Sequence, residues 1–85
     1  MNTTVSKHDK IAAKIRTIIH EKLGVDEMAL ADSAAFSSDL GLDSLDVLET
    51  FMALEKEFSL KISDEDAEKL TTVGSVIDYI TQHIR

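Results

Sequence analysis

The sequence predicts an all-α fold, a small four-helix bundle with three longer helices and one short helix. Apolar residues recur at helical spacing in three stretches, which is typical of helices with one buried face. The 85 residues include no proline and only three glycines, so residues that favour turns between strands are scarce. Neither a repeat nor a low-complexity tract divides the chain. We expect one domain over residues 1–85, with a flexible N-terminus over residues 1–5.

The first helix is expected to begin at Ser6, because the spacing from Ser6 to Asp9 resembles that of a capping box. It should run to Leu23 and stop at Gly24, a residue type that commonly ends helices. The apolar stripe of this helix consists of Ile11, Ile15, Ile18, Ile19 and Leu23.

A long connection from about Gly24 to Leu42 follows the first helix. Connections of this length in a small domain usually have a function or contain a short turn of their own. Four apolar side chains in it are expected to pack on the core: Val25, Met28, Leu30 and Phe36.

The second helix is expected to begin after Asp43, a good N-cap residue, and to run to about Phe58. One apolar row has the spacing of a buried face and consists of Val47, Phe51, Leu54 and Phe58. An adjoining row, interleaved with acidic residues, consists of Leu45, Leu48 and Met52. Two interpretations of this second row stay open. It is the edge of a wide core face, or it is an exposed apolar strip that suits a partner's helix or groove.

Two further helices complete the predicted bundle. Ser63 has the spacing to Asp66 that caps a short helix, which should end near Leu70. Thr72 is expected to cap the last helix, with Tyr79 toward the edge of its buried face. The buried stripe of that helix consists of Val73, Val76, Ile77, Ile80 and Ile84.

Charge is unevenly distributed along the chain. Residues 1–23 carry a net charge of +3 and residues 39–68 a net charge of −8, within a total of −7. Such an acidic field repels nucleic acid and attracts basic protein surfaces. An aromatic share of 5% also argues against a surface that stacks bases. We therefore expect protein partners and no nucleic acid, although a charge run can also serve solubility alone.

Several kinds of site lack the residues they need. The chain has no Cys for a disulfide, a thiolate nucleophile or a thiolate metal site. Its three imidazoles, His8, His20 and His83, share no metal-binding spacing, so no metal is expected. No run approaches the roughly 20 apolar residues of a membrane span, and the polar start is unlike a signal peptide. A monomeric cytoplasmic protein is the simplest expectation.

Ser44 is the most informative residue, because it follows a glycine turn at the expected start of the second helix. Unpaired backbone N–H groups and the positive end of the helix dipole favour an anion at such a position. The Gly-x-Ser-x-Gly spacing of a hydrolase nucleophile is absent. The setting therefore suits an attachment point for a phosphate-linked group and not a catalytic nucleophile.

Longer motifs surround this serine. They are DLGLDSLD at 39–46, MALEKEF at 52–58 and ISDEDAEKLTTV at 62–73, followed by IDYI at 77–80. Together these motifs closely resemble the acyl carrier protein family, and the resemblance extends over nearly the whole chain, from about residue 11 to residue 80.

The resemblance implies a four-helix carrier in which Ser44, flanked by Asp43 and Leu45, receives 4′-phosphopantetheine from coenzyme A through a phosphopantetheinyl transferase. The prosthetic group would supply the thiol that the sequence lacks, and acyl chains would be carried on it as thioesters. Acyl-transferring, condensing and reducing enzymes would perform the chemistry. The protein itself would therefore be no enzyme.

The expected pathway is fatty-acid or related lipid biosynthesis, with the carrier as a discrete protein of the bacterial type. A specialised carrier for lipopolysaccharide, polyketide or nonribosomal peptide assembly would share the fold and the prosthetic group. In a different class, a helical protein-interaction module would use Ser44 only as a cap and would have no prosthetic group.

The family's recognition helix corresponds to the second helix of this chain. The resemblance implies that partner enzymes with basic docking surfaces would meet Asp43, Leu45, Asp46, Leu48, Glu49, Met52, Glu55, Ile62, Asp64, Glu65 and Glu68. The chain departs from the family pattern at Lys56, where an acidic residue is common, and at Thr50 and Phe51, where small aliphatic residues are common. We hypothesise that Phe51 fills space otherwise open to an acyl chain; the alternative is that a smaller neighbouring side chain compensates.

Overall fold

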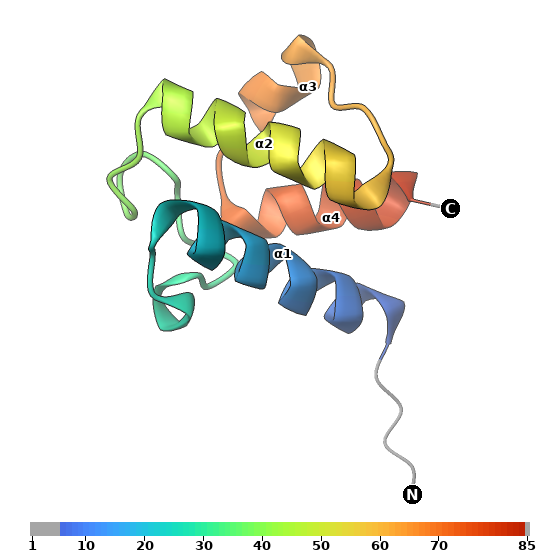
Figure 1. Ribbon diagram of the computed structural model, residues 1–85, viewed down its shortest axis with the longest axis horizontal. Helices are drawn as coiled ribbons and strands as arrows, with labels where there is room; N and C mark the ends of the chain where they lie inside the picture. The colour runs from blue at the N-terminus through green and yellow to red at the C-terminus, as the bar shows by residue number, and fades with distance from the viewer. Residues whose placement is uncertain (1–5, 85) are drawn as a thin grey trace, which may run out of the picture.

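The computed structural model describes residues 6–84 (Figure 1). Within them the chain forms α1 (Lys7–Leu23), the single-turn 3-10 helix η1 (Glu27–Ala29), α2 (Ser44–Phe58), α3 (Asp64–Lys69) and α4 (Val73–His83). The predicted all-α fold of three longer helices and one short helix is confirmed. The expectation of a flexible N-terminus over residues 1–5 lies outside the described residues.

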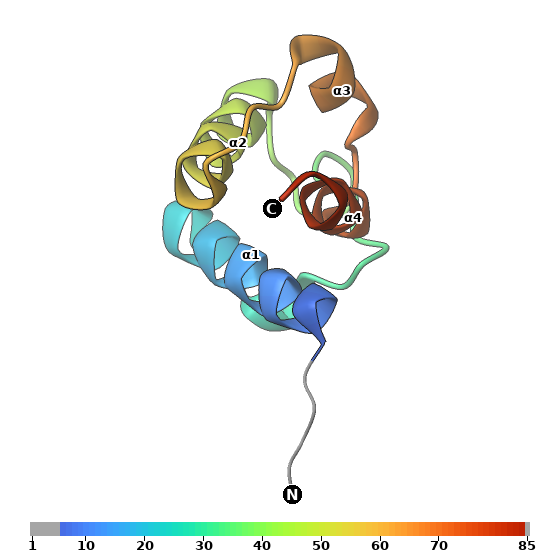
Figure 2. The ribbon, with the colours of Figure 1, turned by 90° about the vertical axis from the view of Figure 1, so that its right-hand side faces the viewer.

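The three longer helices surround one core. Helix α1 packs against both α2 and α4, and α3 lies across the bundle from α1 (Figure 2). Six aliphatic side chains in this core are fully shielded from solvent: Ile15, Ile19, Leu54, Val73, Val76 and Ile80. None of the described helices is both long and apolar enough to cross a membrane.

Each α-helix begins at the residue that its sequence predicts. The side-chain oxygens of Ser6, Asp43, Ser63 and Thr72 each accept a backbone N–H from the first turn of their helix. These bonds satisfy donors that helix geometry leaves unpaired. Helix α1 ends at Gly24, as predicted.

The connection between α1 and α2 packs on the core through most of its predicted anchors. Leu30 and Phe36 are buried and Val25 is half-buried. The prediction for Met28 was wrong, because its side chain is 91% exposed. The carboxylate of Asp26 accepts the Met28 N–H at 2.9 Å and starts the single turn of η1. That turn leaves Met28 in solvent and brings the next large apolar residue, Leu30, to the core.

Arg16 of α1 fastens the same connection. Its Nε donates to the carbonyl oxygen of Leu30 at 2.6 Å, and its guanidinium pairs with the carboxylate of Asp32. The Asp32 carbonyl oxygen in turn accepts the N–H of Gly74 at 2.8 Å, and the Ala34 carbonyl oxygen accepts the N–H of Val73 at 3.0 Å. The connection is thus held between α1 and the start of α4.

The close approach of Asp32 explains the glycine in the first turn of α4. A Cβ at Gly74 would lie 2.9 Å from the Asp32 carbonyl oxygen and 3.0 Å from the Asp32 Cβ. Helix propensity alone makes Gly→Ala stabilising by about 1 kcal/mol. We expect the opposite sign for Gly74→Ala, a loss of about 1–3 kcal/mol in the free energy of unfolding, because a packed backbone has to shift.

Urea unfolding of Gly74→Ala measures this change. Gln82→Ala, at an exposed position of the same helix, is the control and should change stability by less than about 0.5 kcal/mol. An unchanged or raised unfolding midpoint for Gly74→Ala would contradict the close contact.

Tyr79 links the short helix α3 to α4. Its hydroxyl donates to the Asp66 carboxylate at 3.0 Å, and its ring stacks on His83 with the centroids 4.0 Å apart. The pKa of the Tyr79 hydroxyl is raised above its ordinary value of 10.0. Burial is the largest cause, followed by the hydrogen bond to Asp66 and then by the negative charges of Asp66 and Glu55.

The raised pKa gives Tyr79 a predictable effect on stability at alkaline pH. Folding favours the protonated hydroxyl, so its contribution is complete below about pH 10 and is lost as pH rises through the folded-state pKa. We expect Tyr79→Phe to have a lower melting temperature than the wild type at neutral pH, with the difference shrinking above about pH 10. Thermal unfolding of both proteins across this range measures the difference. A constant difference would show that the pKa of the Tyr79 hydroxyl is the same in the folded and unfolded states.

Candidate functional site

Ser44 is the first residue of α2, and its side chain is exposed. The turn before it depends on Gly41, whose backbone has a φ of 66°, a region in which a side chain is strained. On either side of this glycine, Leu40 and Leu42 are partly buried against the core. The N–H of Leu42 also donates to the Phe36 carbonyl oxygen at 2.9 Å. The turn is therefore anchored on both sides of its glycine, and it presents Ser44 to solvent.

The segment that leads into this turn closes on itself and on the start of α4. The Asp39 carboxylate accepts the Ala35 N–H at 2.8 Å, and the Asp39 N–H donates to the Ala35 carbonyl oxygen at 3.0 Å. The Phe36 N–H donates to the Thr71 carbonyl oxygen at 3.0 Å. These bonds connect the position of Ser44 to residues that come almost thirty positions later in the chain.

Asp43 supplies the cap of α2, which leaves the hydroxyl of Ser44 free of that task. The Asp43 carboxylate accepts the Asp46 N–H at 2.9 Å, and the Asp46 carboxylate accepts the Asp43 N–H at 3.4 Å. The two residues form a reciprocal capping box. The hypothesis that Ser44 serves only as a cap therefore loses its premise.

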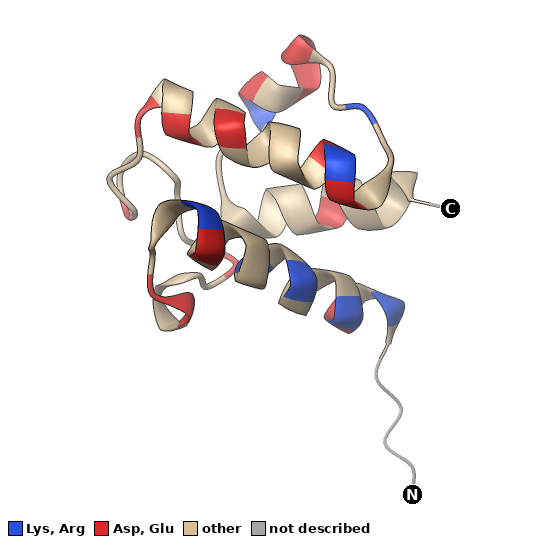
Figure 3. Cartoon of the chain, viewed as in Figure 1, with Lys and Arg blue, Asp and Glu red and all other residues tan. Residues whose placement is uncertain are grey.

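Charge near Ser44 has two opposing components. The start of α2 favours an anion through its unpaired N–H groups and the helix dipole. The carboxylates of α2 and α3 make the surroundings acidic, whereas Lys and Arg gather on α1 (Figure 3). A phosphodiester would thus be accepted locally, while the surface as a whole attracts a basic partner.

The second apolar row of α2 is exposed. Leu45, Leu48 and Met52 have exposed fractions of 61%, 51% and 57%. Single exposed apolar residues are ordinary, but three in one row on one helix form a continuous apolar strip, which is typical of an interaction site. Of the two interpretations of this row, the structure supports the exposed strip and not the edge of the core.

The structure brings most of the expected partner residues together on α2 and α3. Asp43, Glu49, Asp64, Glu65 and Glu68 are exposed beside the apolar strip.

Among the expected partner residues, Asp46 and Glu55 are half-buried and Ile62 is buried, so the inclusion of Ile62 in this surface was wrong. Its side chain is only 6% exposed and belongs to the core cluster. The Glu55 carboxylate accepts the Ile62 N–H at 2.6 Å, which holds the segment between α2 and α3 in place. The family resemblance implied that Ile62 faces partners, whereas packing turns its side chain into the core.

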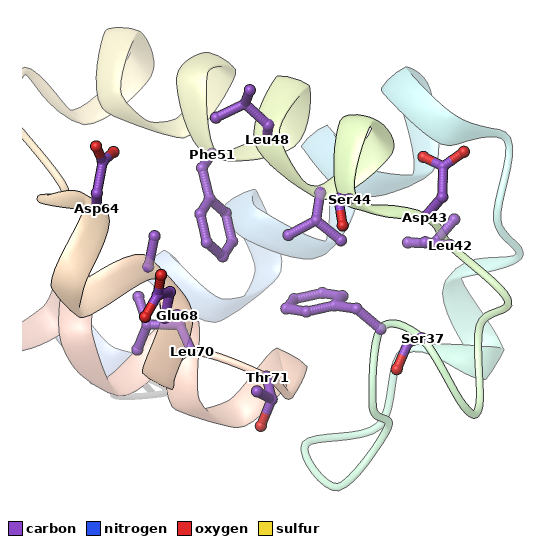
Figure 4. A pocket seen from close by; sticks show the side chains of 13 residues that line it. Ser37, Leu42, Asp43, Ser44, Leu48, Phe51, Asp64, Glu68, Leu70 and Thr71 are labelled. Atoms are coloured by element: carbon purple, nitrogen blue, oxygen red, sulfur yellow. The ribbon is translucent and has the colours of Figure 1, made fainter.

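An apolar cavity of about 710 Å³ lies beside Ser44, between α2 and α3 (Figure 4). Its lining consists of Phe36, Ser37, Leu42, Asp43, Ser44, Val47, Leu48, Phe51, Asp64, Ala67, Glu68, Leu70 and Thr71. Sequence reasoning did not identify the contributions of Ser37, Ala67, Leu70 and Thr71. No local signal could have done so, because the cavity forms only when the segments that contain these residues pack beside α2.

The residues present fit a group that is attached by a phosphate and carries an apolar load. The hydroxyl of Ser44 is exposed at a helix start, and one side of its surroundings opens into the cavity. The aromatic and aliphatic walls of the cavity would shield an apolar chain from water.

Each imidazole lies near a backbone carbonyl oxygen or a carboxylate. Nδ1 of His20 lies 2.8 Å from the Val25 carbonyl oxygen, and Nδ1 of His83 lies 2.7 Å from the Tyr79 carbonyl oxygen. His8 lies 3.4 Å from Asp78. None of the three lines the cavity, and no cluster of three potential metal ligands occurs among residues 6–84.

Comparison with known proteins agrees with this geometry. The profile of the family described as phosphopantetheine attachment site matches residues 13–80. Among solved structures, the chain is similar to an acyl carrier protein from Enterococcus faecalis, with 36% sequence identity and a TM-score of 0.75. That similarity covers 91% of this chain and 98% of the other chain. This chain therefore belongs to the phosphopantetheine attachment-site family, and it is an acyl-carrier-like carrier protein and not an enzyme.

Proposed function

We propose that Ser44 carries 4′-phosphopantetheine and that the protein presents acyl thioesters to enzymes of fatty-acid or related lipid biosynthesis. The observation that carries the proposal is the division of roles at the start of α2, where Asp43 caps the helix and the neighbouring hydroxyl of Ser44 is exposed. A serine that the fold does not need for capping is available for modification.

The residues around Ser44 have separate tasks in this function. The Ser44 Oγ would hold the group as a phosphodiester, and the start of α2 would stabilise the negative charge. When bound, the group would supply the thiol for thioester formation, which this chain, with no Cys, does not have. The anchored turn around Gly41 would hold the attachment point at the rim of the cavity.

The exposed face of α2 suits brief contacts with several enzymes. Glu49 and its acidic neighbours would accelerate encounter with basic docking surfaces through long-range attraction. Leu45, Leu48 and Met52 would then fix the orientation by filling apolar hollows on the partner. Affinity from one apolar strip and screened charges is modest, which allows the carrier to leave each enzyme quickly.

The partners proposed are a phosphopantetheinyl transferase and acyl-transferring, condensing and reducing enzymes, met by a monomeric carrier in the cytoplasm. Specialised lipopolysaccharide, polyketide or nonribosomal peptide assembly would use the same attachment chemistry and differ in cargo. The choice between these pathways depends on the cargo and not on the geometry of Ser44.

The first prediction concerns modification at Ser44. Incubation with coenzyme A and a broad-specificity phosphopantetheinyl transferase should add one phosphopantetheine to the wild type and none to Ser44→Ala, as measured by intact mass. Ser37→Ala is a matched control, because Ser37 is also exposed and lines the same cavity. This control should be modified like the wild type. Modification of Ser44→Ala, or an unmodified wild type, would refute the assignment.

The second prediction concerns the acidic face. Glu49→Lys should lower kcat/KM of the transferase about three- to tenfold, because a rim charge mainly changes the association rate. Added salt should reduce the difference from the wild type. Glu27→Lys on η1 changes the net charge equally at an exposed position outside α2 and should have little effect. Equal losses for both variants would indicate that only net charge matters.

A further inference from the structure

The cavity beside Ser44 has an aromatic inner wall. Phe51 reaches from the middle of α2 into the space between α2 and α3 (Figure 4), and its side chain is only 4% exposed. Its ring meets the ring of Phe36 edge to face, with the centroids 6.1 Å apart and the planes at 76°. This arrangement places the positive edge of one ring toward the negative face of the other, which is a favoured geometry for aromatic pairs.

This wall separates the cavity from the core of the bundle. The lining residues come from α2, α3 and the neighbouring connections, and none comes from α1 or α4. Leu54, Ile77 and Ile80 of the bundle core have exposed fractions of 1% or less, and none of them lines the cavity. Interiors packed in this way have few voids that could receive a further chain. The cavity therefore ends at Phe36 and Phe51 and does not extend between the three longer helices.

Two features make the wall resistant to displacement. Phe51 belongs to the same buried cluster as Leu54 and Ile80, so moving its ring would disturb the core. Phe36 is held by its own backbone, since its N–H donates to Thr71 and its carbonyl oxygen accepts from Leu42. An apolar chain that enters from Ser44 would thus lie against the rings and leave its further length in water.

We propose that Phe51, supported by Phe36, is a specificity-determining residue that limits buried cargo to short and medium acyl chains. This inference rests on the proposed function, because it requires an acyl group attached through Ser44. It adds the class of cargo, which the attachment site itself does not specify. The buried part of a longer chain would be no larger than that of a medium chain.

The test uses full-length protein loaded with a series of acyl groups from butanoyl to palmitoyl. For each sample, intact mass first establishes loading, and the melting temperature is then compared with that of the unacylated carrier. In the wild type the gain should rise with chain length and level off at medium chains. In Phe51→Leu it should level off at longer chains, with the longest cargo adding about 4 °C or more beyond the wild-type plateau.

Phe58→Leu is the matched control, since Phe58 is a partly buried aromatic on α2 that does not line the cavity. Its plateau should coincide with that of the wild type. Phe36→Leu changes the same wall and replaces Phe51→Leu in the test if that variant fails to fold. It should also shift the plateau to longer acyl chains. In the wild type, the methyl NMR shifts of Ile77 and Ile80 should be insensitive to cargo of any length, and this measurement needs no variant.

The outcomes separate the two proposals. Failure to load the wild type at Ser44 would overturn the proposed function and this inference together. Successful loading with the same plateau in wild type and wall variants would overturn only the inference. A wild-type gain that keeps rising to palmitoyl, or core methyl shifts that follow chain length, would also overturn it.

Discussion

The position of Ser44 depends on backbone hydrogen bonds between the long connection that precedes α2 and the start of α4. The carbonyl oxygens of Asp32 and Ala34 accept N–H groups from the first turn of α4, and Phe36 donates to Thr71. Without these bonds the connection would carry unpaired polar groups at the edge of the core, which is costly. Because they are made, the turn at Gly41 and the start of α2 have one position relative to α4.

Two neighbouring residues at the start of α2 have separate roles. Asp43 satisfies the helix donors and Ser44 stays exposed. Attachment of a group at Ser44 would therefore not remove the cap and would leave the helix intact. This separation would let the helix start also serve as the attachment site that we propose.

The charges and the apolar strip of α2 act at different ranges. Carboxylates on α2 and α3 would attract a basic partner over about 8–10 Å before contact, a range set by screening. The exposed side chains of Leu45, Leu48 and Met52 would act only in contact, where a complementary apolar surface would remove them from water. Helix α3 contributes to both the acidic face and the cavity wall, and the Tyr79–Asp66 hydrogen bond connects it to α4. The acidic face and the cavity wall therefore share one short helix.

The sequence by itself determined the helices, their caps and the position of Ser44, because capping, helical periodicity and glycine turns are local and read over a few residues. The sequence also determined that negative charge is concentrated in residues 39–68. Tertiary structure alone decided that Ile62 is buried and that Leu45, Leu48 and Met52 are exposed. It also decided that Phe36, Phe51 and Leu70 meet in one cavity. These outcomes depend on contacts between segments far apart in the chain, and such contacts leave no pattern in the local sequence.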